Sequence, residues 1–573
     1  MVAVYIDPIA GKYVKQIKFS IEYLLKICGF SWRYLDEEIG VLPNDIILYY
    51  SPKFPDEVYA NWMIENTRFI FIPFVKDFYV QGFFTGDVLK QNMKTFVFEV
   101  ELPYISTTRV KKTPINMLEK IGHKYYYLDF DMIGNIFFHL VDEDRHHLKK
   151  TDKNGNLSFE ELGFYGYFNI PYMNHLADLF IMLVRELTES KNNYAIRSCL
   201  WPGDQNYAVT ISHNLDKLTK WSIGTIISSF FKGFIHFITF RWNIIYRDFF
   251  SILKFLFTND EFYWNFYDIT SIEKKEKVKS TWFIGINKDK KLYDYDFDDP
   301  DIMRELQEII NNGSEIALLY KSDKKAIEDI RRDFEVLIPH IRIKNSGIRH
   351  LKYFKETENL DKFQQDLGIK FDSTRRVYNK NAFYNGFALP YPMFIPKNPN
   401  IRQNVMQFPI TFSDELLMLN KYKYMSIKDA TEVFKELQRK VKKVKGLLHI
   451  QFTNSLYHDI KYLPKFHEYI IDEIKNQNGY ITTCSDILEW FEKRSQIKIT
   501  EEPDKIIIKF LAPIDTITFE IIGKRGINNV FGGNCSYKKN TVQFVNTIKN
   551  MEVEINLFPI DTPKVELSNP REL

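Results

Sequence analysis

The sequence predicts an α/β protein in three parts: an N-terminal α/β domain (residues 1–197), a central domain (198–497) and a small C-terminal β-sandwich (498–573). Three observations lead to this prediction. The 573 residues exceed what one hydrophobic core usually serves, since domains hold about 100–200 residues. Strand and helix patterns alternate through the central part. The C-terminal part alternates apolar and polar residues without helical spacing.

The N-terminal domain contains two apolar, β-rich runs that each end at proline, IILYYSP from Ile46 and RFIFIPF from Arg68, which we interpret as buried strands. A helix with apolar residues at helical spacing follows from His175. Between them, the segment from Thr151 (TDKNGNLSFEEL) superficially resembles a calcium loop. Its sixth position, counted from Asp152, is not glycine and its twelfth is not glutamate, so a hairpin turn explains it better.

The central domain repeats strand–helix–strand units from Tyr207 onwards, which predicts an α/β fold, either open or barrel-like. The strands include YAVTISH and KSTWFIGI, and helices follow in DIMRELQEII and AIEDIRRDFEVLI. From Lys498, the runs KIIIKFLA, DTITFEII, TVQFVNT and MEVEINLF predict antiparallel strands. Functional groups of such α/β folds gather at the carboxyl ends of the strands, so the residues that follow each strand are the candidates.

Composition limits the partners and the compartment. Lys+Arg 77 against Asp+Glu 74 leaves a net charge of +3, so we expect no nucleic-acid partner, because such proteins concentrate positive charge. The aromatic fraction of 16% fits either AT-rich codons or a sugar-facing surface. The cysteines form no CxxC pair and predict reduced thiols. Without a secretory signal or a membrane-spanning run, we expect a cytoplasmic location, with a peripheral membrane location as the alternative.

Several motifs of the central domain occur in a characteristic order: TISHNLD, STWF, NGSEIAL, GIRHLKYF, LGIKFDST, AFYNG, TNS and DILEWFEKR. In this order and spacing, roughly residues 200–497 resemble a divergent branch of the polysaccharide deacetylase family, carbohydrate esterase family 4, with the NodB-homology fold. The N-terminal region also resembles the domain that precedes this module in one bacterial branch. The resemblance implies a distorted (β/α)7 barrel with a groove across its C-terminal face.

In active relatives, a carboxylate and two imidazoles hold a divalent metal that activates water, a second carboxylate is the base, and a late histidine is the acid. By this resemblance, Asp216 and His350 match two metal ligands. Leu319 stands where the other imidazole is expected, and an alkyl chain cannot ligate a metal. Asn214 occupies the position of the base, and an amide cannot accept the proton.

Two further positions depart from the family pattern. Thr453 replaces the acid, and its hydroxyl is too weakly acidic to protonate an amine. Tyr384 replaces the arginine that orients the base. The resemblance therefore predicts a degenerate site without confident catalytic residues and with either no cofactor or a weakly held divalent metal such as zinc. The expected substrate cleft contains seven residues: Asn214, Arg349, His350, Asp372, Tyr384, Asn385 and Asn454.

Each surviving group also has a structural interpretation. Asp216 would then cap the next element, His350 would be a core imidazole, and Arg349 with Asp372 would form a buried ion pair. A sharper alternative brings His213, Asp216 and His350 together, since two imidazoles and a carboxylate suit a divalent transition metal.

Residues 217–267 form an aromatic insert between the first two strands of the central domain, with isolated basic residues among many aromatic ones. Three interpretations stay open: a cover over the barrel, a contact with a protein partner or second copy, and a membrane-surface element.

The resulting expectation is a deacetylase-like protein of bacterial surface-polysaccharide metabolism that acts by binding glycan or a partner enzyme. The alternatives are an active metal-dependent N- or O-deacetylase with displaced residues, and a structural subunit of an assembly.

Overall fold

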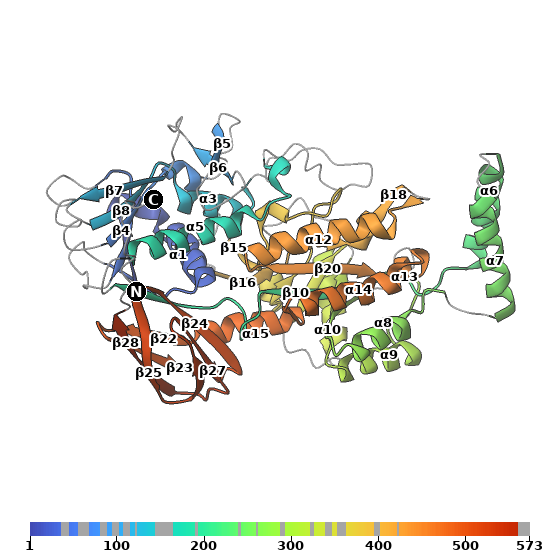
Figure 1. The fold of residues 1–573 in the computed structure, drawn as a ribbon. Coiled ribbons are helices and arrows are strands. Elements are labelled where there is room, and N and C mark those ends of the chain that lie inside the picture. The colour runs from blue at the N-terminus through green and yellow to red at the C-terminus, as the bar shows by residue number, and fades with distance from the viewer. Residues whose placement is uncertain are drawn as a thin grey trace, which may run out of the picture. The chain divides into compact units, whose positions relative to one another are not determined.

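The computed structural model describes the chain outside residues 36–44, 55–67, 81–88, 94–101, 107–114, 121–122, 144–163, 190–192, 239–241, 259–261, 287–292, 321–325, 339–345, 352–362, 395–401, 421–422 and 560–573. The rejected calcium loop lies outside the described residues. The chain divides into two compact units (Figure 1). The terminal unit holds Met1–Glu143, His175–Asp204 and Trp490–Leu573, and the central unit holds Asp144–Asn174 and Gln205–Glu489.

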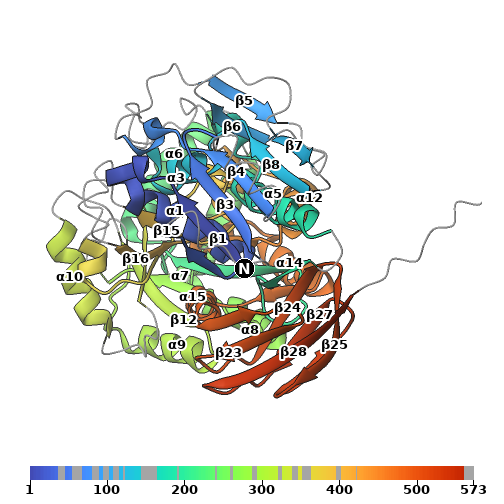
Figure 2. The same ribbon diagram turned by 90° about the vertical axis from the view of Figure 1, so that its left-hand side faces the viewer.

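The terminal unit contains a six-stranded sheet in the order β2-β1-β3-β4-β8-β7, parallel except for β7 (Figure 2). Its core strands β3 and β4 are the two predicted apolar runs. The strands are β1 (Val2–Ile6), β2 (Trp32–Tyr34), β3 (Ile46–Ser51), β4 (Arg68–Pro73), β7 (Ile115–Lys120) and β8 (His123–Leu128), with the separate pair β5 (Leu89–Met93) and β6 (Leu102–Ser106). The helices are α1 (Val14–Cys28), α3 (Met132–Leu140) and α5 (Tyr172–Leu187), and α5 is the helix expected from His175.

Two four-stranded antiparallel sheets form the rest of the terminal unit, in the orders β22-β23-β28-β25 and β26-β27-β24-β9. Their bounds are β9 (Tyr194–Ser198), β22 (Ile497–Glu501), β23 (Lys505–Phe510), β24 (Thr516–Gly523), β25 (Arg525–Phe531), β26 (Asn534–Tyr537), β27 (Thr541–Val545) and β28 (Met551–Pro559). Phe510 of the first sheet contacts Phe519 and Phe544 of the second. Strand β9 comes from before the central domain, so sequence position alone did not reveal that it pairs with β24. The division into three domains stays a prediction.

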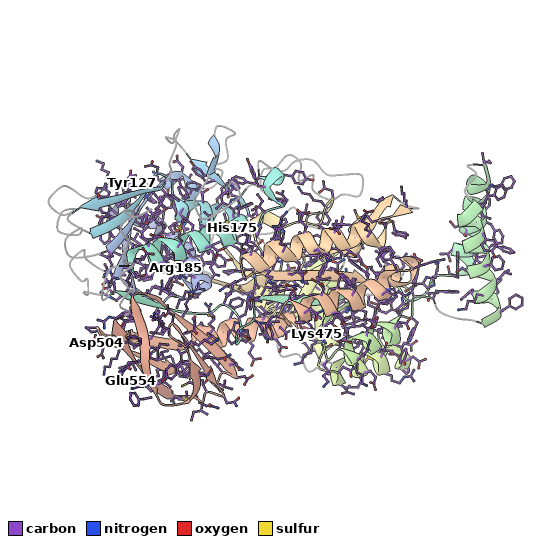
Figure 3. All side chains as sticks on the ribbon, viewed as in Figure 1. Tyr127, His175, Arg185, Lys475, Asp504 and Glu554 are labelled. Carbon is purple, nitrogen blue, oxygen red and sulfur yellow. The ribbon has the colours of Figure 1, made fainter. Side chains whose placement is uncertain are left out.

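Ion pairs also connect β9 and α5 to β24. Glu520 of β24 accepts from Arg185 at 3.0 Å and from Arg197 at 2.8 Å (Arg185 is labelled in Figure 3). The four cysteines are free thiols, as the sequence predicted.

The central unit is built on a parallel sheet whose main path is β14-β13-β12-β11-β10-β20-β17. Its strands are β10 (Tyr207–Leu215), β11 (Thr281–Ile284), β12 (Glu315–Tyr320), β13 (Gly347–His350), β14 (Phe371–Asp372), β15 (Tyr391–Phe394), β16 (Arg402–Gln407), β17 (Phe412–Ser413), β20 (Leu447–Thr453) and β21 (Gly479–Ile481). Residues 402–413 pair with β14 through β16 and with β20 through β17, so the sheet curls back towards its first strands. This mixed α/β architecture with a curled sheet confirms the predicted class.

Helices pack their apolar stripes on the outer face of the curled sheet and form the main core with it. The stripes include Ile302 and Leu306 of α9 and Phe434 and Leu437 of α12. The helices of this unit are α6 (Ile223–Ile238), α7 (Trp242–Thr258), α8 (Phe266–Lys275), α9 (Pro300–Asn311), α10 (Ala326–Leu337), α12 (Ile427–Lys443), α13 (Asn454–Asp459), α14 (Leu463–Asn476) and the start of α15 (Cys484–Ser495), with the short pair β18 (Met418–Asn420) and β19 (Lys423–Tyr424). The inner face carries polar side chains, among them Ser212, Asn214 and Arg349.

Candidate functional site

Strand β10 separates the candidate residues between the two faces of the sheet, because successive side chains of a strand point to opposite sides. Ile211 and Leu215 lie in the outer, helix-covered core. His213 belongs to the same face, and its ring lies 4.5 Å from that of Trp282 in this core. Ser212 and Asn214 point to the inner face, where both contact Arg349. His213 and Asn214 are therefore neighbours in sequence but not in space.

Arg349 is the centre of the inner face and is only 2% exposed. Its Nη1 donates to Asn214 Oδ1 at 2.6 Å, and its Nη2 donates to the hydroxyls of Ser212 at 2.9 Å and Ser373 at 2.7 Å. Its Nε donates to the Ser373 carbonyl at 3.2 Å, and the guanidinium carbon lies 3.8 Å from the ring centre of Phe283. Burial lowers the pKa of Arg349 to about 9. The expected ion pair with Asp372 is not formed, and neutral acceptors hold this cation instead.

A second imidazole reaches the same guanidinium from β20. His449 Nε2 lies 3.2 Å from Arg349 Nη2 and 3.0 Å from the Ser212 hydroxyl. Burial and the positive charge of Arg349 hold the pKa of His449 well below its usual value, so this ring is neutral. Sequence reasoning missed His449, although its alternation with Gln451 and Thr453 along β20 places it on the inner face.

Three carboxylates gather where β10, β17 and β20 end. Asp216 accepts from the backbone N–H of Ser455 at 3.0 Å and from its hydroxyl at 2.6 Å, so it caps α13. Asp414 accepts from the backbone N–H of Thr453 at 2.7 Å and from its hydroxyl at 3.1 Å. Burial raises the pKa of Asp216 to about 6 and raises that of Asp414 well above its usual range.

Glu415 completes this acidic group. Its Oε2 forms an ion pair with Arg376 at 2.8 Å. Its Oε1 accepts from Gln451 at 3.1 Å and lies 3.3 Å from the Thr453 hydroxyl. Asp414 and Glu415 were not among the residues expected from the sequence. They lie in a short 3-10 turn after β17, a strand of only two residues that has no recognisable hydrophobic pattern.

His350 and Asp372 lie on the other side of the sheet from Arg349. His350 Nε2 lies 3.2 Å from the amide nitrogen of Gln364, which donates to Asp372 Oδ2 at 2.8 Å. The other oxygen of Asp372 accepts from Thr374. Burial lowers the pKa of His350. The structure therefore separates His350 from Asp216 and does not bring the expected pair of metal ligands together.

The remaining expected residues have structural contacts. Leu319 is a buried partner of Arg349 across β12 and β13. Tyr384 is 1% exposed and its ring lies 6.3 Å from that of Phe168, so it presents no face to a ligand. Asn385 is buried with a left-handed backbone (φ 53°). Asn454 donates to two backbone carbonyls at 2.6 Å each.

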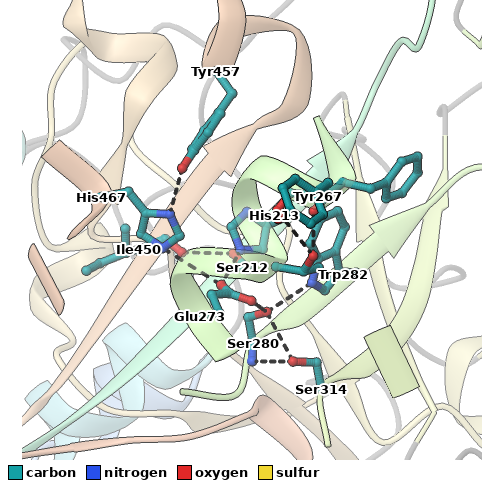
Figure 4. A network of polar contacts seen from close by, with 12 residues as sticks. Ser212, His213, Tyr267, Glu273, Ser280, Trp282, Ser314, Ile450, Tyr457 and His467 are labelled. Atoms are coloured by element: carbon teal, nitrogen blue, oxygen red, sulfur yellow. Dashed lines mark hydrogen bonds and ion pairs between the residues drawn. The ribbon is translucent and has the colours of Figure 1, made fainter. Parts of the chain in front are cut away.

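A buried polar network lies on the outer face (Figure 4). His213 Nε2 lies 2.7 Å from Glu273 Oε1, and Ser280 donates to Glu273 Oε2 at 2.7 Å. His467 Nε2 lies 3.8 Å from Glu273 Oε1, and its Nδ1 lies 3.2 Å from the hydroxyl of Tyr457. Within the described part of the chain, His213, Glu273 and His467 form the group of three side chains whose potential metal-ligand atoms all lie within 4.8 Å of one another. Neither Glu273 nor His467 was expected, because helix spacing alone does not distinguish a buried acid from an exposed one.

The fit of a metal differs between the two places. At the inner face, Asp216 is hydrogen-bonded to Ser455, and Leu319 supplies no ligand. His350 lies on the opposite side of the sheet, so the expected site does not fit an ion. On the outer face, two imidazoles and a carboxylate are donors that zinc accepts. However, Glu273 already accepts on both oxygens, and the group is buried in the apolar core, so we interpret it as a structural hydrogen-bond network.

The chain was compared with known proteins. No protein-family model and no curated protein sequence matches it. Among solved structures, a protein of Mycobacterium smegmatis described as a polysaccharide deacetylase is 14% identical with a TM-score of 0.34 and covers 52% of this chain and 93% of its own. One from Pseudomonas aeruginosa PAO1, described likewise, is 12% identical with a TM-score of 0.34 and covers 51% and 93%.

The allantoinase PuuE is 13% identical with a TM-score of 0.33 and covers 50% of this chain and 91% of its own. These likenesses concern about half of the chain. No helix among the described residues has the length and apolar character needed to cross a membrane.

Proposed function

We propose that the chain is a polysaccharide deacetylase-like protein of bacterial surface-polysaccharide metabolism, built on a distorted (β/α)7 barrel, that binds glycan or a partner enzyme without hydrolysing acetyl groups. One observation carries the non-hydrolytic part. The side-chain oxygen of Asn214, at the position expected for the base, accepts from Arg349 at 2.6 Å. An amide oxygen has no useful basicity, and this one is already occupied.

The rest of the inner face supports the same proposal. A general acid or a general base each accelerates a reaction by about 10²–10⁴-fold. Each group must lie within hydrogen-bond distance of the proton that it transfers. The hydroxyl of Thr453, at the position expected for the acid, donates a hydrogen bond to Asp414. The order of the sequence motifs supports the glycan connection, while the persistence of a polar inner face without these groups favours binding over turnover.

The test measures acetate release from N-acetylated chito-oligosaccharides and from O-acetylated polysaccharide, together with glycan-array binding by the same preparation. We expect no release above a no-protein control, and binding to at least one surface polysaccharide. Substantial release by the wild type would contradict the non-hydrolytic assignment. Absence of binding to every glycan would remove the glycan part and leave a partner enzyme or a structural subunit.

The alternative of an active deacetylase with displaced residues has one specific observation in its favour. Asp216 and Asp414 lie at neighbouring strand ends, and burial raises the pKa of both. Carboxylates with such pKa values serve as general acids and bases. Acetate release that Asp216→Ala abolishes would support this alternative. Asp372→Asn is the matched control, because Asp372 is also buried but contacts Gln364 and Thr374 on the other face.

A further inference from the structure

Helices α6 and α7 form a hairpin with an unusual surface. The two helices pack side by side (Figure 1), and Trp221 at its base donates to the hydroxyl of Ser251 at 2.8 Å. Large apolar side chains are exposed along both helices. They are Ile227, Phe230, Phe231, Phe237 and Ile238 on α6, and Trp242, Tyr246, Phe249, Phe250, Leu256 and Phe257 on α7. The interpretation of the insert as a cover is therefore wrong for these side chains.

The exposed apolar residues follow helical spacing. On α7, Trp242, Tyr246 and Phe249 are separated by four and three residues, which places them on one face of the helix. Ile252, three residues after Phe249, borders this face and is buried. On a helix of a globular protein the apolar stripe normally faces the core, whereas here an apolar stripe faces solvent. Such a contiguous exposed surface marks an interaction site.

The charge of the hairpin indicates the kind of partner. Residues 221–258 hold four basic residues (Lys232, Arg241, Arg247 and Lys254) and one acidic residue (Asp248), a net charge of 4 − 1 = +3. The whole chain of 573 residues has the same net charge. A segment that is rich in apolar and aromatic residues and has an excess of basic ones is complementary to a bilayer surface with anionic headgroups, where aromatic side chains prefer the interface.

The length of the hairpin limits how it can bind. Helices of 16 and 17 residues extend about 24–26 Å, less than the roughly 30 Å of a hydrocarbon core. We propose that the α6–α7 hairpin is a monotopic membrane-binding element that lies in the headgroup region of anionic membranes, with its exposed aromatic stripe inserted. This proposal is independent of the proposed function of the inner face.

The test is sedimentation of the full chain with vesicles of phosphatidylcholine alone and of phosphatidylcholine mixed with phosphatidylglycerol. We expect binding to the mixed vesicles, weaker binding to phosphatidylcholine, and a decrease when salt rises from about 0.05 to 0.5 M. The triple variant Phe231→Ala, Tyr246→Ala and Phe257→Ala removes three largely exposed side chains and should weaken partitioning by at least about tenfold.

Phe531→Ala on β25 is the matched control, because Phe531 is also an exposed aromatic residue but lies in the terminal unit. It should bind like the wild type, and circular dichroism should show that all variants are folded. Two results would overturn the proposal: equal sedimentation of the triple variant and the wild type, or no sedimentation of the wild type with anionic vesicles. In the latter case, light scattering that shows a dimer lost in the triple variant would identify a second copy as the occupant.

Discussion

Replacing Arg349 by alanine should destabilise the central unit more than any change at its surface. The guanidinium is the donor for Asn214 Oδ1 and the Ser373 carbonyl, both buried on the inner face. A buried acceptor without a donor costs about 1–3 kcal/mol, so the two together cost about 2–6 kcal/mol of unfolding free energy. The space left by the side chain adds to this loss.

Urea titration followed by tryptophan fluorescence and circular dichroism measures the effect as a shift of the unfolding midpoint. Arg304→Ala is the control, because Arg304 is an exposed residue of α9 that pairs with Asp301 at 3.0 Å, and surface pairs contribute about 0–1 kcal/mol. The unfolding midpoint of Arg349→Met, which retains much of the side-chain volume, should lie between those of Arg349→Ala and Arg304→Ala. Equal midpoints for Arg349→Ala and Arg304→Ala would refute the hydrogen-bond network on the inner face.

Two further predictions concern titration and metal removal. Burial raises the pKa of Asp216 from 3.8 to about 6, so the folded chain retains a proton that the unfolded chain loses. Ionisation of Asp216 therefore lowers the free energy of unfolding as pH rises from 3.8 to about 6. The variant Asp216→Asn should flatten the plot of unfolding free energy against pH in that range, and an unchanged slope would contradict this. Dialysis against EDTA should leave the melting temperature unchanged, because both oxygens of Glu273 have partners, His213 at 2.7 Å and Ser280 at 2.7 Å, without an ion. A lower melting temperature that zinc restores would instead indicate a metal in that group.

The sequence was sufficient to predict the strands and helices with strong patterns. The apolar runs from Ile46 and Arg68 are β3 and β4, and the periodic segment from His175 lies in α5. These elements bury continuous apolar surfaces, so their periodicity is visible locally. Strand β17 contains only Phe412 and Ser413, and its pairing with β20 depends on long-range contacts that no local pattern reports.

The site was less predictable, because two residues can contact each other only when their side chains lie on the same face of the sheet. Side chains alternate along a strand, so His213 and Asn214 could not both face one site, and this much was visible in the sequence. The partner of His213 was not visible, since Glu273 lies 60 residues away on α8. For His350, the register of β13 against β12 places Arg349 on the inner face and the imidazole on the outer one.

The contacts of the acidic group bear on the proposed absence of hydrolysis. A carboxylate that acts as a base needs a lone pair directed at its substrate. Both oxygens of Asp216 already accept from Ser455, and both oxygens of Asp414 accept from Thr453. Hydrogen bonds to charged groups contribute about 1.5–3 kcal/mol each, so turning the ionised Asp216 carboxylate away from Ser455 would cost about that amount for each bond broken. The apolar side chains of α6 and α7 are already exposed, so the proposed membrane binding requires no such rearrangement.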